Sequence, residues 1–284
     1  MSPRPAIGVF DSGVGGLTVL KELVALVPAA DYLYFGDTAR LPYGSKSVET
    51  VARYALSAAR FLEEKKIELL VVACNTASAL ALPQIVGGVR VPVIGVIEPG
   101  ADAAAAASRT RKAVVIGTEG TVASHAYQRA LAARGIEARE QACPLFVPLV
   151  EEGWTDHPVT EQVAHIYLDA LFKNGPAGAD VMVLGCTHYP LLKPLLRRLA
   201  PPQVTIVDSA ESTARAVARS AAVSAAVAGA SSLPREQDAR ATAGGTPALR
   251  FFSTDSVEKF RRLGARFLGH PVEDVAHVDL DRLP

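Results

Sequence analysis

The sequence predicts an α/β fold of two similar α/β domains, each a parallel sheet flanked by helices, related by a pseudo-two-fold. Short apolar runs alternate with stretches of helical periodicity, which is the order of an α/β protein. Most of these runs are almost continuously apolar, as strands covered on both faces of a sheet are. The predicted strands are residues 6–10, 31–35, 68–73, 92–97, 113–117, 180–185, 204–208 and 249–253.

A weak internal repeat relates the strand ends of the two halves. AIGVFDSG at 6–13 resembles AVVIGTEG at 113–120, and ELLVVACNT at 68–76 resembles DVMVLGCTH at 180–188. Each half therefore offers a first strand that ends in a polar turn and a later strand that ends in a cysteine. This correspondence predicts two domains of the same topology that face each other.

The repeat also sets the expected domain boundaries. We expect a first domain from residues 1–98 plus about 210–284, with the strand and helix at 249–267 returning to the first sheet. The second domain is expected to cover 99–209. The segment 227–248 is rich in Ala, Gly, Ser and Pro, and we expect it to form a flexible loop.

Composition excludes several classes of partner. The chain has 284 residues, of which 49% are hydrophobic, and its 29 basic and 29 acidic residues give a formal charge of zero. A neutral chain has no broad electrostatic footprint for nucleic acid or an anionic membrane, so neither partner is expected. No transmembrane run or signal peptide is visible. Three cysteines without an export signal favour a reducing, cytoplasmic location over a disulfide framework.

Four residues with chemical potential follow predicted strands. They are Asp11, Cys74, Thr118 and Cys186. In an open parallel sheet, ligands bind beyond the carboxyl ends of the strands. If the two domains face each other, these four side chains converge on one interdomain cleft, which is the predicted active site.

Cys74 and Cys186 occupy corresponding places in the repeat, which argues against both being buried filler. Each precedes polar side chains at an expected helix N-terminus, a setting that lowers a thiol pKa from about 8.5. Cys143 lacks such neighbours and is expected to be structural. A redox pair is disfavoured because CxxC spacing is absent. No metal site is expected, because zinc needs four ligands and the CTH stretch at 186–188 supplies only two, at poor spacing.

The remaining use of two thiols is acid–base chemistry from opposite sides of one carbon, the geometry that a racemase needs. Each sulfur would have to come within about 3–3.5 Å of that carbon, so the two sulfurs would lie roughly 6–7 Å apart. One would be a thiolate and the other a thiol when substrate arrives, and their roles would exchange with the enantiomer.

Neighbouring residues have both functional and structural interpretations. The loop DSGVGGLT at 11–18 suits a carboxylate ligand, and it misses the dinucleotide pattern GxGxxG because Thr18 stands at a glycine position. In that rejected interpretation Asp37 would contact a ribose hydroxyl. Asp11 is a helix cap, a proton-transfer group or both. His188 is either a core histidine or a proton acceptor and orienter for Cys186, because its ordinary pKa near 6.5 suits that task.

Six stretches together resemble the cofactor-independent glutamate racemases, and they spread across almost the whole chain. They are GVFDSGVGGLTVLKEL (8–23), YFGDTARLPYGSKS (34–47), VVACNTAS (71–78), VIEPGA (96–101), ACPLFVPLVEEG (142–153) and VLGCTHYPLL (183–192). The resemblance implies an amino-acid racemase that interconverts L- and D-glutamate without pyridoxal phosphate or metal. It implies a cytoplasmic homodimer that supplies D-glutamate for peptidoglycan.

The resemblance also implies residue roles. Cys74 would take the α-proton of D-glutamate with help from Asp11, and Cys186 would take that of L-glutamate. His188 and Glu151 would assist Cys186, with the adjacent Glu152 as the alternative carboxylate. The residues implied to contact substrate are Asp11, Ser12, Pro42, Tyr43, Gly44, Ser45, Asn75, Thr76, Thr118, Thr121, Thr187 and His188.

Two other functions stay open at this point. An aspartate racemase would have the same chemistry, because selection for side-chain length cannot be derived from these residues. A two-domain amino-acid-binding protein without turnover is the alternative from another class. It would need neither Cys74 nor Cys186, so the cysteine pair favours an enzyme.

Overall fold

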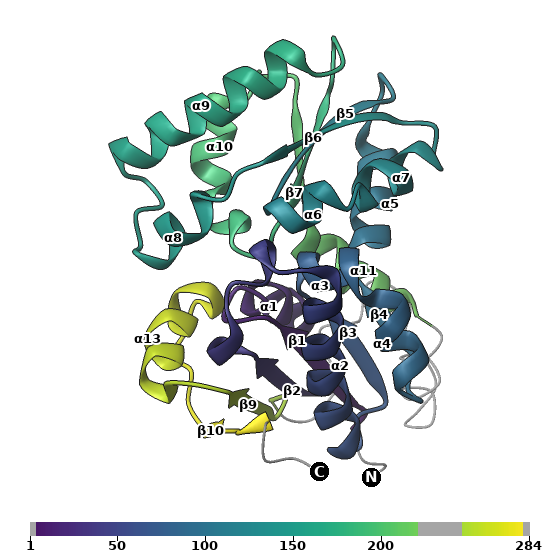
Figure 1. Ribbon diagram of the computed structural model, residues 1–284, viewed down its shortest axis with the longest axis vertical. Coiled ribbons are helices and arrows are strands. Elements are labelled where there is room, and N and C mark those ends of the chain that lie inside the picture. The colour runs from purple at the N-terminus through teal and green to yellow at the C-terminus, as the bar shows by residue number, and fades with distance from the viewer. Residues whose placement is uncertain (1–3, 221–245, 281–284) are drawn as a thin grey trace.

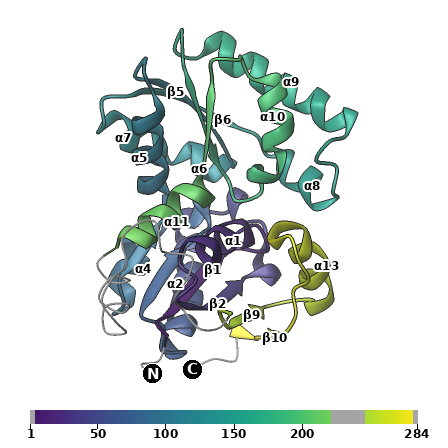
Figure 2. The same cartoon turned by 180° about the vertical axis from the view of Figure 1, so that it is seen from behind.

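The computed structural model describes residues 4–220 and 246–280, and their strands form two sheets in which every paired strand is parallel. The first sheet has the order β10-β9-β2-β1-β3-β4 and the second the order β6-β5-β7-β8. Figures 1 and 2 show the sheets one above the other, with helices on both sides of each. The predicted fold class is confirmed.

The strands of the first sheet are β1 (Ala6–Asp11), β2 (Asp31–Gly36), β3 (Leu69–Val72), β4 (Val93–Gly95), β9 (Leu249–Ser253) and β10 (Val275–His277). Those of the second are β5 (Lys112–Gly117), β6 (Glu137–Ala142), β7 (Val181–Gly185) and β8 (Thr205–Asp208). The helices are α1 (Leu17–Leu26), α2 (Val48–Glu64), α3 (Asn75–Leu80), α4 (Leu82–Gly88), α5 (Ile97–Ala107), α6 (Glu119–Ala123), α7 (Ala126–Ala132), α8 (Phe146–Glu151), α9 (Pro158–Asn174), α10 (Lys193–Leu199), α11 (Ser209–Arg219) and α13 (Val257–Leu268).

The internal repeat of the sequence reappears as strand order. The order β2-β1-β3-β4 in the first sheet matches β6-β5-β7-β8 in the second. In both sheets the chain leaves the first strand to one side and later returns to its other side, which creates a topological switch point. Asp11 and Cys74 lie at the switch point of the first sheet, and Thr118 and Cys186 lie at that of the second.

The strands that carry these residues are buried on both faces. Val9, Val71, Val115 and Val183 have no exposed surface, as expected for parallel strands between layers of helices. This packing fixes the strand ends and therefore the starting points of the loops that follow them.

The C-terminal segment completes the first sheet. Strand β9 pairs with β2, so that Tyr34 lies opposite Phe251, and β10 pairs with β9. Helix α13 then packs against α1. The expected return of 249–267 to the first sheet is therefore present in the structure.

The sequence analysis missed two strands and predicted a third that is longer than the one in the structure. Strand β6 is polar and partly exposed at the edge of its sheet, and β10 is a short edge strand, so neither has the apolar signature of a central strand. The run 92–97 contributes only β4, because Ile97 already belongs to α5. Of the loop expected at 227–248, residues 227–245 lie outside the described residues. No helix within the described ranges is long and apolar enough to span a membrane.

Candidate active site

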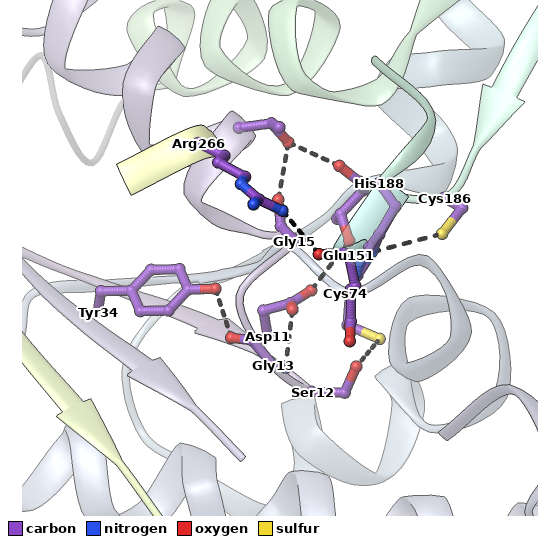
Figure 3. Close-up of polar contacts among 12 residues, drawn as sticks. Asp11, Ser12, Gly13, Gly15, Tyr34, Cys74, Glu151, Cys186, His188 and Arg266 are labelled. Carbon is purple, nitrogen blue, oxygen red and sulfur yellow. Dashed lines mark hydrogen bonds and ion pairs between the residues drawn. The ribbon is translucent and has the colours of Figure 1, made fainter. Parts of the chain in front are cut away.

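Cys74 lies at the carboxyl end of the first sheet, between β3 and α3. It is the N-cap residue of α3, and its sulfur accepts a hydrogen bond from the Ala77 N–H at 3.4 Å. The thiol donates to Ser12 Oγ at 3.5 Å, and Ser12 belongs to the loop after β1 (Figure 3). Only 5% of Cys74 is exposed. The sulfur therefore sits where the ends of β1 and β3 meet.

The pKa of Cys74 differs from the expectation based on its helix N-terminus. Burial and the negative charge of Asp11 raise this pKa to about 12, although the contacts from Ser12 and Ala77 act to lower it. The expected depression of the pKa is wrong for Cys74, because desolvation outweighs the hydrogen bonds from Ser12 and Ala77 that reach the sulfur. Cys74 is a neutral thiol near pH 7 in this structure.

Cys186 follows β7. The His188 imidazole lies next to its sulfur, and the Glu151 carboxylate lies on the far side of that imidazole. Its sulfur lies 4.0 Å from His188 Nδ1, and His188 Nε2 lies 3.2 Å from Glu151 Oε1 (Figure 3). Cys186 is 5% exposed and His188 is 6% exposed. Glu151 makes this contact, whereas the adjacent Glu152 is exposed, so the geometry favours Glu151 as the supporting carboxylate.

The pKa of His188 depends on both Cys186 and Glu151. Burial disfavours the His188 cation, but the hydrogen bonds and negative charges of Cys186 and Glu151 outweigh it and raise the His188 pKa to about 10. The hydrogen bond from His188 lowers the Glu151 pKa against the effect of burial. His188 therefore places a positive charge beside the Cys186 sulfur.

Asp11 connects the two strand ends across the junction between the sheets. Its Oδ2 accepts from the Gly13 N–H at 2.9 Å, and its Oδ1 accepts from Thr187 Oγ1 at 3.4 Å. Burial raises the pKa of Asp11, while the His188 charge and the hydrogen bonds to the carboxylate oppose that rise. The carboxylate thus belongs to both halves of the site.

The glycine-rich loop after β1 allows this close approach. A Cβ on Gly15 would lie 2.3 Å from Thr187 Oγ1 and 2.5 Å from His188 Nδ1, so no larger residue fits there without a shift. Thr18 Oγ1 also donates to the Thr187 carbonyl at 3.1 Å. The loop 11–18 therefore packs directly on the turn that carries Cys186.

Three threonine hydroxyls form a second cross-junction cluster. Thr76 Oγ1 lies 2.9 Å from Thr118 Oγ1 and 3.4 Å from Thr121 Oγ1, and the last two are 2.9 Å apart. A Cβ on Gly44 would lie 2.9 Å from the Thr118 Cβ. The structure therefore brings together residues that the sequence analysis linked to substrate from three separate stretches of chain.

Other predicted contact residues have partners inside the protein. The Tyr127 hydroxyl donates to Asn75 Oδ1 at 2.7 Å, and Asn75 Nδ2 donates to Ser209 Oγ at 3.2 Å. The Asn75 side chain is thus held by interior groups. Pro42 and Ser45 are exposed beside the buried Tyr43.

Asp37 has a structural explanation in place of the rejected ribose contact. It is fully buried and accepts hydrogen bonds from the Tyr43 hydroxyl at 2.6 Å and from Thr254 Oγ1 at 2.8 Å. Asp37 therefore ties the 42–45 turn to the C-terminal segment.

Cys143 differs from the other two cysteines. It is fully buried, its sulfur is 3.7 Å from the Gln141 carbonyl oxygen, and burial raises its pKa well above the usual range. Among residues 4–220 and 246–280, no group of three or more His, Cys, Asp or Glu side chains is arranged to hold a metal ion.

Three side chains that support the site were missed by the sequence analysis. The Tyr34 hydroxyl donates to the Gly13 carbonyl at 2.8 Å, Arg266 Nη1 donates to the Glu151 carbonyl at 2.8 Å, and the Phe267 ring meets the His188 ring edge-on. Tyr34 looked like an ordinary strand residue. Arg266 and Phe267 are about eighty residues from the nearest predicted site residue, and no local pattern marks them.

The arrangement supplies two thiols from opposite sheets, each with its own acid–base partners. Comparison with known proteins identifies the family. The family model of Asp/Glu/hydantoin racemases matches residues 7–217. The chain belongs to this racemase family. It is 61% identical over 98% of both chains to a glutamate racemase of Koribacter versatilis, and 45% identical over 99% of both chains to one of Thermus thermophilus.

Solved structures of racemases agree with the fold of this family member. The glutamate racemase of Thermus thermophilus in complex with β-chloro-D-alanine has a TM-score of 0.82 at 44% identity and covers 100% of both chains. That of Francisella tularensis in complex with D-glutamate has a TM-score of 0.84 at 32% identity over 99% of both chains. An aspartate racemase of Picrophilus torridus, at 16% identity and a TM-score of 0.57, shares the fold.

Proposed function

We propose that the protein is a glutamate racemase that interconverts L- and D-glutamate with Cys74 and Cys186 as its two bases and without a cofactor. The observation that carries the proposal is the pair of strand-end thiols at corresponding switch points of two facing sheets. The glutamate racemases among its relatives, which cover nearly the whole chain, support glutamate as the substrate.

In the proposed reaction, a thiolate removes the α-proton from one face of the substrate carbon and becomes a thiol. The opposite thiol delivers its proton to the other face and becomes a thiolate. Cys186 acts on L-glutamate and Cys74 on D-glutamate, so one turnover exchanges the protonation states of the two sulfurs. Each sulfur must come within about 3–3.5 Å of the carbon in the substrate complex.

The surroundings of the two sulfurs favour one starting state. Cys74 retains its proton because its pKa is raised to about 12, while Cys186 has the His188 imidazole, whose pKa is raised to about 10, 4.0 Å from its sulfur. We infer that in this arrangement Cys186 is ready to remove the α-proton of L-glutamate. Asp11, whose charge acts on Cys74, is proposed to assist the reverse direction.

The carbanion formed between the two steps needs preorganised donors in a site that excludes water. The hydroxyls of Ser12, Thr76 and Thr187 and the threonines of the cross-junction cluster are proposed to hold the substrate carboxylates and ammonium group. Because both cysteines are only 5% exposed, we infer that substrate enters when the two sheet edges separate and reacts when they close.

The decisive experiment is incubation of the purified protein with L-glutamate in heavy water. We expect loss of optical rotation and incorporation of one deuterium at the α-carbon. Absence of both would refute the racemase and leave a binding protein. The same incubation with L-aspartate separates the two racemase alternatives, and we expect glutamate to be turned over far faster.

Several broader features belong to the same proposal. We propose a first domain of residues 1–98 plus about 210–284 and a second of 99–209, a homodimer, and a cytoplasmic role in supplying D-glutamate for peptidoglycan. Four exposed apolar side chains on and beside α8 and α9 support a protein contact, since large apolar groups on a surface often mark one. They are Leu145, Trp154, Val159 and Ile166. Light scattering of the purified protein tests the dimer.

A further inference from the structure

Helix α13 belongs to the first sheet but contacts the acid–base line of the second. It follows β9 and packs on α1, and in both Figure 1 and Figure 2 it lies beneath α8. Helix α8 ends at Glu151, the carboxylate that meets His188. The contacts between α13 and α8 therefore join the two halves of the molecule at the Cys186 side of the site.

Arg266 makes a direct contact between these helices. Its Nη1 donates to the backbone carbonyl of Glu151 at 2.8 Å (Figure 3). The last carbonyls of a helix lack partners within the helix and carry its negative dipole end, so a guanidinium is a favoured partner there. The contact holds the backbone of the residue whose side chain meets His188.

Gly153 makes room for the Arg266 guanidinium. This glycine has a φ of 83° and follows the end of α8. A Cβ at this position would lie 2.9 Å from Arg266 Nη1. The end of α8 is therefore shaped to receive the arginine, in addition to being bonded to it.

Two neighbours on α13 act on the same pair of residues. The Phe267 ring meets the His188 ring edge-on, with centroids 5.0 Å apart, and is 2% exposed. The positive charge of Lys259 contributes to lowering the Glu151 pKa. One face of α13 thus contacts His188 through Phe267 and influences Glu151 through Arg266 and Lys259.

We propose that Arg266 is a positioning residue for the Cys186 half of the reaction, because it fixes the end of α8 so that Glu151 stays on His188. This inference rests on the proposed racemase function. Arg266 touches neither sulfur and acts only through Glu151. Its loss is therefore expected to slow proton transfer at Cys186 and to leave transfer at Cys74 unchanged.

The test is the Arg266→Ala variant, with Arg262→Ala, another exposed arginine of α13, as the matched control. We expect kcat/KM to fall about tenfold in Arg266→Ala, the effect of one charge-assisted hydrogen bond. Because a racemase has an equilibrium constant of one, this fall must be the same in both directions. Arg262→Ala is expected to match the wild type.

Deuterium isotope effects on kcat/KM separate positioning from a structural role. With the Cys186 step slowed, the isotope effect of α-deuterated L-glutamate should rise, because Cys186 removes that deuteron. The effect with α-deuterated D-glutamate should fall toward unity, because removal by Cys74 no longer limits the rate. A smaller active fraction would lower the rates and leave both isotope effects unchanged.

A double variant tests the route through Glu151. In the Glu151→Gln background, Arg266→Ala should cause less than about a twofold further loss, since residues that act as a unit are not additive. Unchanged isotope effects or a full additional tenfold loss would overturn the inference. If Arg266→Ala does not fold, the same measurements are made on Arg266→Lys and Arg266→Gln. Absence of racemisation in the wild type would instead refute the proposed function.

Discussion

Thr187 Oγ1 donates a hydrogen bond to Asp11 Oδ1 at 3.4 Å, across the junction between the two sheets. Thr187 directly follows Cys186, and the negative charge of Asp11 is one of the causes that raise the pKa of Cys74. The surroundings of the two thiols are therefore connected through one carboxylate and one hydroxyl. A shift of either loop changes both sides of the site together.

Gly15→Ala is the sharpest test of that close contact. The new methyl group would lie 2.3 Å from Thr187 Oγ1 and 2.5 Å from His188 Nδ1, so the two loops must move apart. We expect kcat to fall about 100-fold or more, because displacing reacting groups by about 1 Å has an effect of that size. Steady-state kinetics measures the loss.

The control for this variant is Gly87→Ala, since a Cβ on Gly87 of α4 has nothing within 4 Å. We expect it to keep full activity and to gain slightly in stability from higher helix propensity. Normal turnover by Gly15→Ala would show that the loops need not touch for catalysis.

The two proposed bases should be individually indispensable. Cys74→Ala and Cys186→Ala are each expected to lower racemisation by about 10²–10⁴-fold, the usual contribution of a general acid–base group, with unchanged circular dichroism. Cys143→Ala is expected to keep its activity, because this fully buried thiol bonds only weakly to the Gln141 carbonyl. Substantial racemisation by either of the first two variants would contradict the two-sided reaction.

Opposite shifts are expected for the Cys74 pKa in two neighbouring variants. Asp11→Asn removes a negative charge that raises this pKa, whereas Ser12→Ala removes a hydroxyl that lowers it by hydrogen-bonding to the thiolate. In a background of Cys143→Ala and Cys186→Ala, alkylation by iodoacetamide at pH 9 should therefore be faster in Asp11→Asn and slower in Ser12→Ala. Shifts in the same direction would mean that another group controls the thiol.

The sequence predicted the site best where strands end. Both central strands of each half are continuously apolar, so the pattern of residues alone places Asp11, Cys74, Thr118 and Cys186 at carboxyl ends. The resemblance to racemases favoured Glu151 and left Glu152 as the alternative carboxylate, and the contact of Glu151 with His188 agrees with that preference.

What the sequence could not predict depends on distant packing. The Cys74 pKa was expected to be low because the helix N-terminus is visible in the sequence, whereas the burial that raises it is not. Strand β6 escaped because an edge strand needs no apolar run. Arg266 has no local motif, since its role depends on the return of α13 to a surface formed much earlier in the chain.

The pH dependence of stability tests the charge on His188. Its pKa is raised from 6.5 to about 10 in the folded protein, so folding favours the protonated form. The resulting stabilisation is fully present below about pH 6.5, the pKa expected of the unfolded chain, and is lost as the pH rises through the folded pKa. The free energy of unfolding in urea for wild type and His188→Asn should therefore differ most at and just below pH 6.5 and converge toward pH 10. His165→Asn, which removes an exposed histidine of α9, should stay close to the wild type throughout. A gap between wild type and His188→Asn that stays constant from pH 6.5 to 9.5 would mean that His188 is held neutral beside Cys186, and the sulfur would then lack its cationic partner.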